Sequence, residues 1–199
     1  MKTWIGADPG GEGKFGVAVL HSETNAVTVV TDSADGAVDF VRRTMKGPPS
    51  GIGVDAPLWW SSGPTGIRHA DRWIRERHGL APKNVQAVNS MWGAVLAQGM
   101  LFVARMREAF PGIPVTEAHP KAVLAALSEE ERRHHFGVYA QLLTNEKASE
   151  DRRDAIIAAL AAREGFEGRW THDLSAERDR SEQDPQAHWL APVRYFWPV

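Results

Sequence analysis

The sequence contains no cysteine among its 199 residues. This absence excludes disulfide bonds, thiolate metal sites and cysteine nucleophiles, so carboxylates, histidines and hydroxyls must carry any chemistry. The chain also lacks the run of roughly 18 apolar residues that a membrane-spanning helix needs. Met1 and Lys2 lead directly into a predicted strand rather than into the apolar segment of a signal peptide. We therefore expect no membrane association and a cytoplasmic location.

A strong charge of either sign is also absent, since the formal net charge is -2 at pH 7. This balance gives no general attraction to polyanions, so a nucleic-acid partner would have to meet a local basic patch. The fractions of hydrophobic residues (43%) and charged residues (24%) are typical of a globular protein. The length fits one domain over residues 1–199. No internal repeat is present, and no pattern indicates the oligomeric state.

The opening stretch Thr3–Leu20 has the pattern of a strand, a glycine-rich turn and a returning strand. Gly10, Gly11 and Gly13 supply the backbone freedom that a tight reversal needs. Asp8 stands where the first strand ends, which suits a metal ligand or a catalytic group. An aspartate that only opens a turn is the alternative.

The following segments predict how the sheet continues. A turn over 21–25 leads to a third strand, Ala26–Thr31, and the three strands form an antiparallel meander. The spacing of apolar residues then predicts a crossover helix over 35–46 and a short strand over 52–56. A strand reached through a helix pairs most easily in parallel with the first strand. Asp55 is therefore expected at the same edge of the sheet as Asp8.

Two features after Asp55 are candidates for substrate contact. Trp59 and Trp60 cannot both face one side, so one is expected in the core and the other on a stacking surface; Trp59 is our candidate for the second role. The predicted helix 67–78 is the most basic in the chain, and its Arg68, Arg72 and Arg75 are candidate phosphate ligands. A merely solvated basic face is the alternative.

The second half predicts a long helix over 91–110 that covers one sheet face, and a short strand over 113–118 that carries Glu117 near its end. Pro120 begins the next helix, at the position where proline is best tolerated. Ser128 opens a capping box, and the helix that follows is expected to run toward Leu143.

The final predicted helix spans 149–163, with Ser149 as N-cap and Gly165 as the residue that ends it. Asp151 and Asp154 share one face of this helix. Acids in a first turn also complement the helix dipole, an explanation that fits Asp151 better than Asp154. The polar stretch 171–187 is expected to be a mobile loop, and 193–197 a closing strand.

Five short motifs carry a resemblance to a known family over about residues 3–165. They are Asp8-Pro9-Gly10-Gly11, Val54–Leu58, Arg68–Arg72, Glu117–Pro120 and Asp151–Ala155. In this order they resemble the predicted ribonuclease-H-like nucleases known as domain of unknown function 429. That family is close to the Holliday-junction resolvase branch of the ribonuclease H-like superfamily. The chain departs from the pattern in its Glu12-Gly13-Lys14 extension and in its long polar stretch before the last strand.

The resemblance implies an α/β, three-layer fold with a mixed five-stranded sheet and helices on both faces. It also implies a nuclease that cleaves phosphodiester bonds with Mg²⁺ or Mn²⁺, ions that oxygen ligands suit. The implied catalytic residues are Asp8, Asp55, Glu117 and Asp154, and the implied metal ligands are Asp8, Asp55, Asp151 and Asp154. The implied substrate contacts are Arg68, Arg72, Trp59 and Lys121. His119 is a candidate proton shuttle or a structural histidine.

Two other functions are open. A ribonuclease-H-like scaffold without activity could bind a protein or a nucleic acid, and it would not bind Mn²⁺. A small-molecule phosphotransferase of the actin and sugar-kinase type uses a similar opening turn, but it needs two copies of the fold. A DNA-binding regulator is disfavoured because no helix-turn-helix pattern lies beside a strongly basic face.

Overall fold

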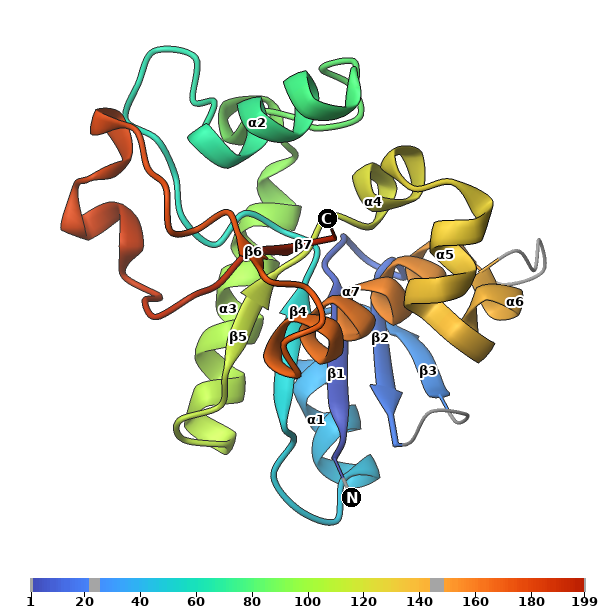
Figure 1. Ribbon diagram of the computed structural model, residues 1–199. Helices are drawn as coiled ribbons and strands as arrows, with labels where there is room; N and C mark the ends of the chain where they lie inside the picture. Colours follow the sequence, from blue (N-terminus) through green and yellow to red (C-terminus); the bar gives the residue numbers. More distant parts are fainter. Residues whose placement is uncertain (1, 22–25, 144–148, 199) are drawn as a thin grey trace.

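A five-stranded mixed sheet forms the centre of the computed structural model, which describes residues 2–21, 26–143 and 149–198 (Figure 1). The strands are β1 (Trp4–Asp8), β2 (Phe15–Leu20), β3 (Ala26–Thr31), β4 (Gly51–Val54) and β5 (Val115–Glu117), in the spatial order β3-β2-β1-β4-β5. The first three strands are antiparallel, and β4 and β5 continue the sheet in parallel with β1. The predicted meander and parallel strands are confirmed. The predicted turn over 21–25 lies outside the described residues except for His21.

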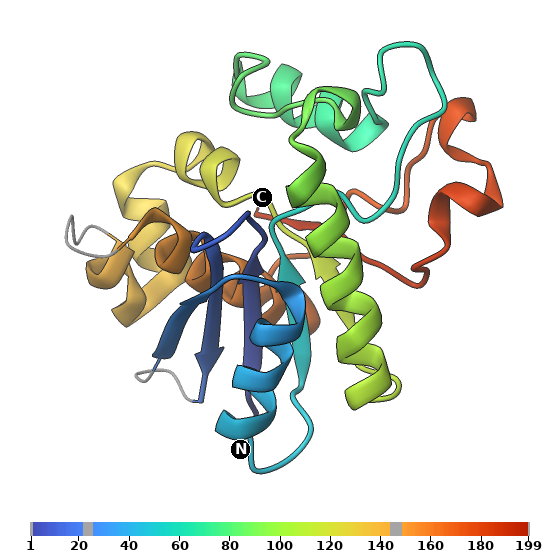
Figure 2. The same cartoon turned by 180° about the vertical axis from the view of Figure 1, so that it is seen from behind.

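Helices cover both faces of this sheet. The α-helices are α1 (Ala34–Thr44), α2 (His69–His78), α3 (Gly93–Ala109), α4 (Pro120–Ala126), α5 (Glu129–Phe136), α6 (Ala140–Leu143) and α7 (Glu150–Phe166). Figure 2 shows α1 and α3 on one face, whereas α7 crosses the other face in Figure 1. The expected α/β architecture with helices on both faces is confirmed. None of the described helices is both long and apolar enough to cross a membrane.

The alternation of side chains in β1 separates the two faces. Ile5 and Ala7 are fully buried, and the register of β1 with β4 places Ala7 beside Val54, which faces Gly99 of α3. Gly6 and Asp8 point to the opposite face, toward α7, because side chains in a strand alternate. Asp8 is thus directed to the α7 face by its position in the strand.

Three glycines let α7 lie directly on the sheet. A Cβ atom built on them would meet helix carbonyl oxygens: Gly16 that of Asp151 at 2.0 Å, Gly6 that of Ala155 at 1.8 Å and Gly53 that of Ala158 at 1.9 Å. Such distances leave no space for a side chain at any of the three positions. The glycines of β2, β1 and β4 therefore set the height and path of the helix that carries Asp151 and Asp154.

The ends of two helices differ partly from expectation. Ser128 forms the predicted capping box, but α5 ends at Phe136 and does not continue to Leu143. The next residue, Gly137, takes a positive φ of 54°, which ends the helix. Ser149 caps α7 as predicted, but Gly165 does not end it. The helix continues to Phe166, and Gly168 takes the left-handed conformation (φ 76°). Gly165 instead makes room for another side chain, since a Cβ there would lie 2.0 Å from the Phe196 ring.

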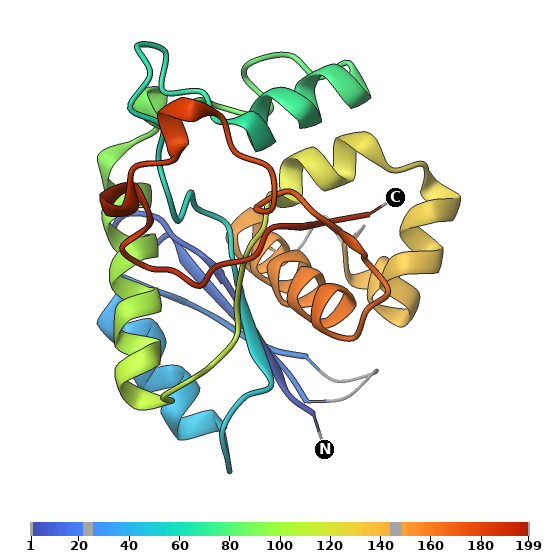
Figure 3. The same ribbon diagram turned by 60° about the vertical axis from the view of Figure 1, so that its left-hand side comes forward.

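The polar stretch 171–187 is structured rather than a plain loop. It contains β6 (His172–Asp173), which pairs with β7 (Phe196–Trp197), and it includes η3 (Arg180–Glu182) and the start of η4 (Pro185–His188). Figure 3 shows this segment folding back along the side of the molecule where β5 lies. The predicted closing strand over 193–197 is a strand only at Phe196–Trp197, which pairs with β6, while Arg194 forms an isolated parallel bridge to Thr116 of the main sheet.

Candidate active site

Asp8 and Asp55 lie at the ends of neighbouring parallel strands. Ala7 of β1 pairs with Val54 of β4, and the Asp55 N–H donates to the Ala7 carbonyl at 2.8 Å. The two aspartates are the next residues of these paired chains, whose backbones are about 4.8 Å apart in a sheet. Their separation is therefore set by strand pairing. Both follow a glycine of the α7 contact by two residues, so both point toward α7.

Helix α7 brings two more acids to this edge. The carbonyl of Asp151 lies on Gly16, which is the register partner of Asp8. The Asp154 side chain is only 1% exposed, and its Oδ1 accepts a hydrogen bond from Arg153 Nε at 2.8 Å. Its Oδ2 is buried and has no hydrogen-bond partner among the described residues. The structure thus brings together the four acids that were predicted as metal ligands.

Burial and the nearby charges raise the pKa of three of these carboxyl groups. The pKa of Asp8 is raised to about 10, first by burial and then by the negative charges of Asp55, Asp154 and Asp151. Burial, followed by the charge of Asp154, raises the pKa of Asp55 well above its usual range. Burial also raises the pKa of Asp154, against the opposing effect of Arg153. A cation bound here would have to displace protons.

Lys121 and His119 border the acids from the start of α4. Lys121 Nζ lies 2.9 Å from Glu150 Oε1, and both side chains are more than half exposed. His119 Nδ1 is buried and 3.8 Å from Asp55 Oδ1, too far for a hydrogen bond. Burial lowers the pKa of His119 to about 4, so the ring is neutral at pH 7. A neutral ring with this pKa is poorly suited to the predicted proton shuttle.

A cavity of about 200 Å³ opens beside Asp8 and Asp55, two of the four acids. Its lining includes Asp8, Asp55, His119 and Lys121, together with Lys83 and Trp92. Sequence reasoning missed the last two residues, which lie in the connection from α2 to α3. The available signal was a tryptophan at the second position of the predicted helix 91–110, directly after a segment rich in polar residues.

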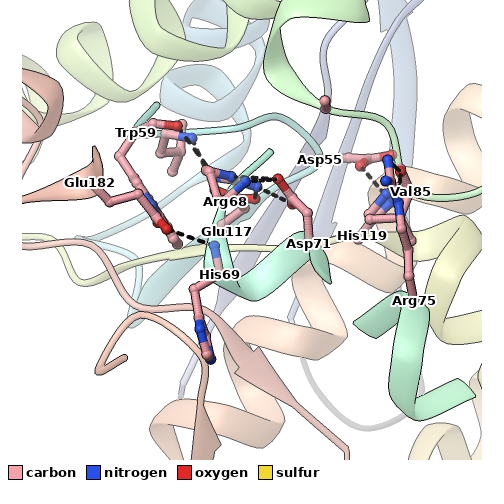
Figure 4. A network of polar contacts seen from close by, with 12 residues as sticks. Asp55, Trp59, Arg68, His69, Asp71, Arg75, Val85, Glu117, His119 and Glu182 are labelled. Carbon is pink, nitrogen blue, oxygen red and sulfur yellow. Dashed lines mark hydrogen bonds and ion pairs between the residues drawn. The ribbon is translucent and has the colours of Figure 1, made fainter. Parts of the chain in front are cut away.

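The structure contradicts the roles predicted for Arg68 and Glu117. The Arg68 side chain is only 2% exposed, and its guanidinium donates to Glu117 at 2.8 and 2.5 Å and to Asp71 at 3.0 and 2.7 Å (Figure 4). Glu117 accepts a further hydrogen bond from the Leu58 N–H at 2.9 Å. Arg68 is therefore not accessible to a phosphate, and both carboxylate oxygens of Glu117 are already bound to Arg68.

The prediction for Trp59 is also wrong. Trp59 is 1% exposed and packs beneath Arg68, whose guanidinium lies 4.4 Å from the ring centre. Its Nε1 donates to Glu182 Oε2 at 3.0 Å, an acid from the polar C-terminal stretch (Figure 4). Trp59 is thus the core tryptophan of the pair, whereas Trp60 is partly exposed.

The two other arginines that were predicted as phosphate ligands contact the protein itself. Arg72 Nη2 lies 2.7 Å from Asp179 Oδ2, and Arg75 Nε donates to the Val85 carbonyl at 2.8 Å. These contacts fasten α2 to the C-terminal stretch and to the connection that leads to α3. Arg72 keeps a side chain that is partly open to solvent, so it stays a candidate for substrate contact.

The metal assignment stays a prediction. Within the described ranges, no three His, Asp or Glu side chains are grouped so that they could hold an ion as they stand. The ribonuclease H-like assignment and the family resemblance stay predictions as well. No family description, no curated protein and no solved structure matches this chain.

Proposed function

We propose that this protein is a metal-dependent nuclease that hydrolyses phosphodiester bonds on a ribonuclease H-like fold. The observation that carries the proposal is the buried Asp154 Oδ2, which has no partner in the described part of the chain and belongs to the acid group of Asp8 and Asp55. A buried carboxylate oxygen without a partner costs free energy unless it is protonated or meets a cation. A cation site explains why such an oxygen is kept.

The donor set fits Mg²⁺ or Mn²⁺. Its members are all carboxylates, from Asp8, Asp55, Asp151 and Asp154, and hard divalent cations prefer oxygen ligands. Such ions supply charge neutralisation, an activated water and stabilisation of the leaving oxygen in phosphodiester hydrolysis. Asp8 is the natural shared ligand because its pKa is affected by each of the other three acids.

The remaining groups serve to attract substrate and to release protons. The cavity lining includes Lys83 and Lys121. Their positive charges would attract a phosphate backbone toward the acids. Because the pKa of Asp8 is raised to about 10, cation binding releases a proton at neutral pH, and its affinity rises with pH. His119 packs beside Asp55 and restricts that side chain rather than carrying a proton.

The order of elements supports the fold assignment. The meander, the crossover helix, the parallel strands and the glycine-seated final helix occur in the order that the resemblance implies. The acids lie at the ends of β1 and β4 and on α7. The family resemblance implies acids at the same positions.

The inactive scaffold has two observations in its favour. Arg153 binds Asp154 Oδ1 at 2.8 Å, and no ion-holding group of three donors exists as the described side chains stand. A small-molecule phosphotransferase is disfavoured, because a cavity of about 200 Å³ is smaller than the roughly 300–1,000 Å³ of pockets that enclose such ligands.

Thermal melts with EDTA and with Mn²⁺ separate nuclease from scaffold. Mn²⁺ should raise the melting temperature of the wild type, since a ligand of the folded state stabilises by mass action. Asp8→Asn and Asp154→Asn should abolish this rise, whereas Asp39→Asn, an exposed acid on α1, should keep it. Cleavage of labelled DNA and RNA should follow the same pattern. Equal responses of all four proteins would reject the nuclease in favour of the scaffold.

A further inference from the structure

Trp92 is the most exposed large hydrophobic residue that the structure describes. It is 81% exposed, whereas the tryptophans of the core are nearly inaccessible. A tryptophan that leaves both ring faces in water gains nothing from packing, so its position calls for another explanation. Exposed aromatic rings at the rim of a cavity commonly serve as contact surfaces for ligands.

The backbone of Trp92 is fixed although its ring is free. The residue is the N-cap of α3, and its carbonyl accepts from the N–H groups of Val95 at 3.0 Å and Leu96 at 3.4 Å. The preceding 3₁₀ helix η1 (Val88–Ser90) is anchored by buried Val88. Because the backbone is already fixed, only the side-chain torsions of the ring lose entropy when a ligand packs on it.

The surroundings of the ring indicate what kind of ligand this is. Trp92 lines the same cavity as Asp8 and Asp55, together with Lys83 and Lys121. In the part of the chain that the structure describes, the Lys83 ammonium has no hydrogen-bond or ion-pair partner. A flat aromatic surface beside separate cationic groups is the arrangement that binds bases and backbone of single-stranded nucleic acid. In a duplex, neighbouring base pairs cover the faces that a tryptophan would need.

We propose that Trp92 is the stacking subsite for an unpaired base, so that the substrate of the proposed nuclease is single-stranded nucleic acid. This inference rests on the proposed function and names its substrate class. Stacking on Trp92 would place one nucleotide at the rim, and Lys83 and Lys121 would lead the backbone to the acids. Because every base has an aromatic face, the subsite does not select a sequence.

The test measures binding of a fluorescein-labelled oligothymidylate by anisotropy. Cleavage is prevented in two ways. In the first, wild type and the Trp92 variants are measured in EDTA; in the second, each protein also carries Asp8→Asn and is measured in Mg²⁺. Trp92→Ala should weaken binding about tenfold with an unchanged salt slope, because stacking is lost and phosphate contacts are kept. Trp92→Phe should stay within about threefold of wild type, since a ring still stacks.

Two controls make this result specific. Trp189→Ala removes another exposed tryptophan (55%) that does not line the cavity, and it should leave affinity unchanged. A closed circular duplex, which has no terminal base pair, should bind equally to wild type and to Trp92→Ala. Melting temperatures should not change in either variant, because both side chains are mainly in solvent.

Three results would overturn the inference: unchanged oligothymidylate affinity in Trp92→Ala, an equal loss for the duplex, or no binding in either condition. The proposed function fails by a different experiment. If Trp92→Ala weakens binding while Mn²⁺ stabilises wild type and Asp8→Asn equally, the subsite stands and the metal-dependent nuclease falls. If the Mn²⁺ response depends on Asp8 but Trp92→Ala binds normally, the nuclease stands and the subsite falls.

Discussion

Two groups of ionisable side chains lie near each other at one edge of the sheet, and they are built differently. The acidic group consists of Asp8, Asp55, Asp151 and Asp154. The arginine cluster consists of Arg68, Asp71 and Glu117. Each includes an acid from the end of a parallel strand, Asp55 after β4 and Glu117 at the end of β5. In the arginine cluster one guanidinium binds both acids, whereas the acidic group holds an oxygen without a partner.

The comparison distinguishes a structural use of buried charge from a functional one. Burial alone would lower the pKa of Arg68, but Asp71 and Glu117 raise it well above its usual range, so the guanidinium stays charged and bound to both acids. Burial and repulsion instead push protons onto Asp8 and Asp55. The repulsion among these acids opposes folding at neutral pH. Clusters of this kind are typical of functional sites, where binding or catalysis requires them.

The largest effect is expected for Arg68→Met. It would leave Asp71 and Glu117 buried without a cation, which typically destabilises by about 3–5 kcal/mol. Urea denaturation at pH 7 measures this loss. Arg72→Met on the same helix is the matched control, because the Arg72–Asp179 pair is partly exposed and should contribute less than about 1 kcal/mol. Similar losses in both variants would show that the cluster has no special structural role.

A smaller effect that is confined to the acidic group is expected for Gly6→Ala. Its Cβ would lie 1.8 Å from the Ala155 carbonyl, so α7 must shift, at a cost of about 1–3 kcal/mol. The shift moves Asp154 and should also reduce Mn²⁺ stabilisation. Gly11→Ala meets no atom within 4 Å and should stay within about 0.5 kcal/mol of wild type. Equal stability of the two variants would mean that the glycines do not seat the helix.

Asp8→Asn should change how stability depends on pH. The folded pKa of Asp8 is raised to about 10, so its contribution is fully present below about pH 4 and is lost as pH rises toward 10. In EDTA from pH 5 to 8, the variant should lose this dependence, which amounts to at most about 1.4 kcal/mol per pH unit. Urea denaturation across this range measures it, with Asp39→Asn as control. Parallel curves for wild type and Asp8→Asn would contradict the repulsion that we describe.

The smallest effect is expected for Lys121→Met. Lys121 is the cation beside the acidic group, but its pair with Glu150 is more than half exposed and should contribute less than about 1 kcal/mol. The loss should vanish in about 1 M salt, where screening acts over about 3 Å. Glu150→Gln should behave alike. A loss as large as that of Arg68→Met would mean that the acidic group is compensated after all.

The local pattern of the sequence was sufficient for the five strands of the main sheet, for the helices that cover it and for the meeting of Asp8 with Asp55. Alternating apolar residues predict strands, a 3.6-residue spacing predicts helices, and a crossover helix sets two strands parallel. Once these are known, strand-end acids must share an edge. These features depend on residues that are close in sequence or on rules of chain connection, which is why they could be predicted.

Only the tertiary structure decided how each charged or aromatic group is used. Glu117 resembles Asp55 as a strand-end acid, yet the Arg68 side chain, 49 positions away in the chain, binds it and removes it from the site. Glu182 was unremarkable within a polar stretch until folding placed it on Trp59. Trp92 and Trp59 differ only in what packs around them. Ion pairing and burial are properties of groups that meet in space, so no local pattern determines them.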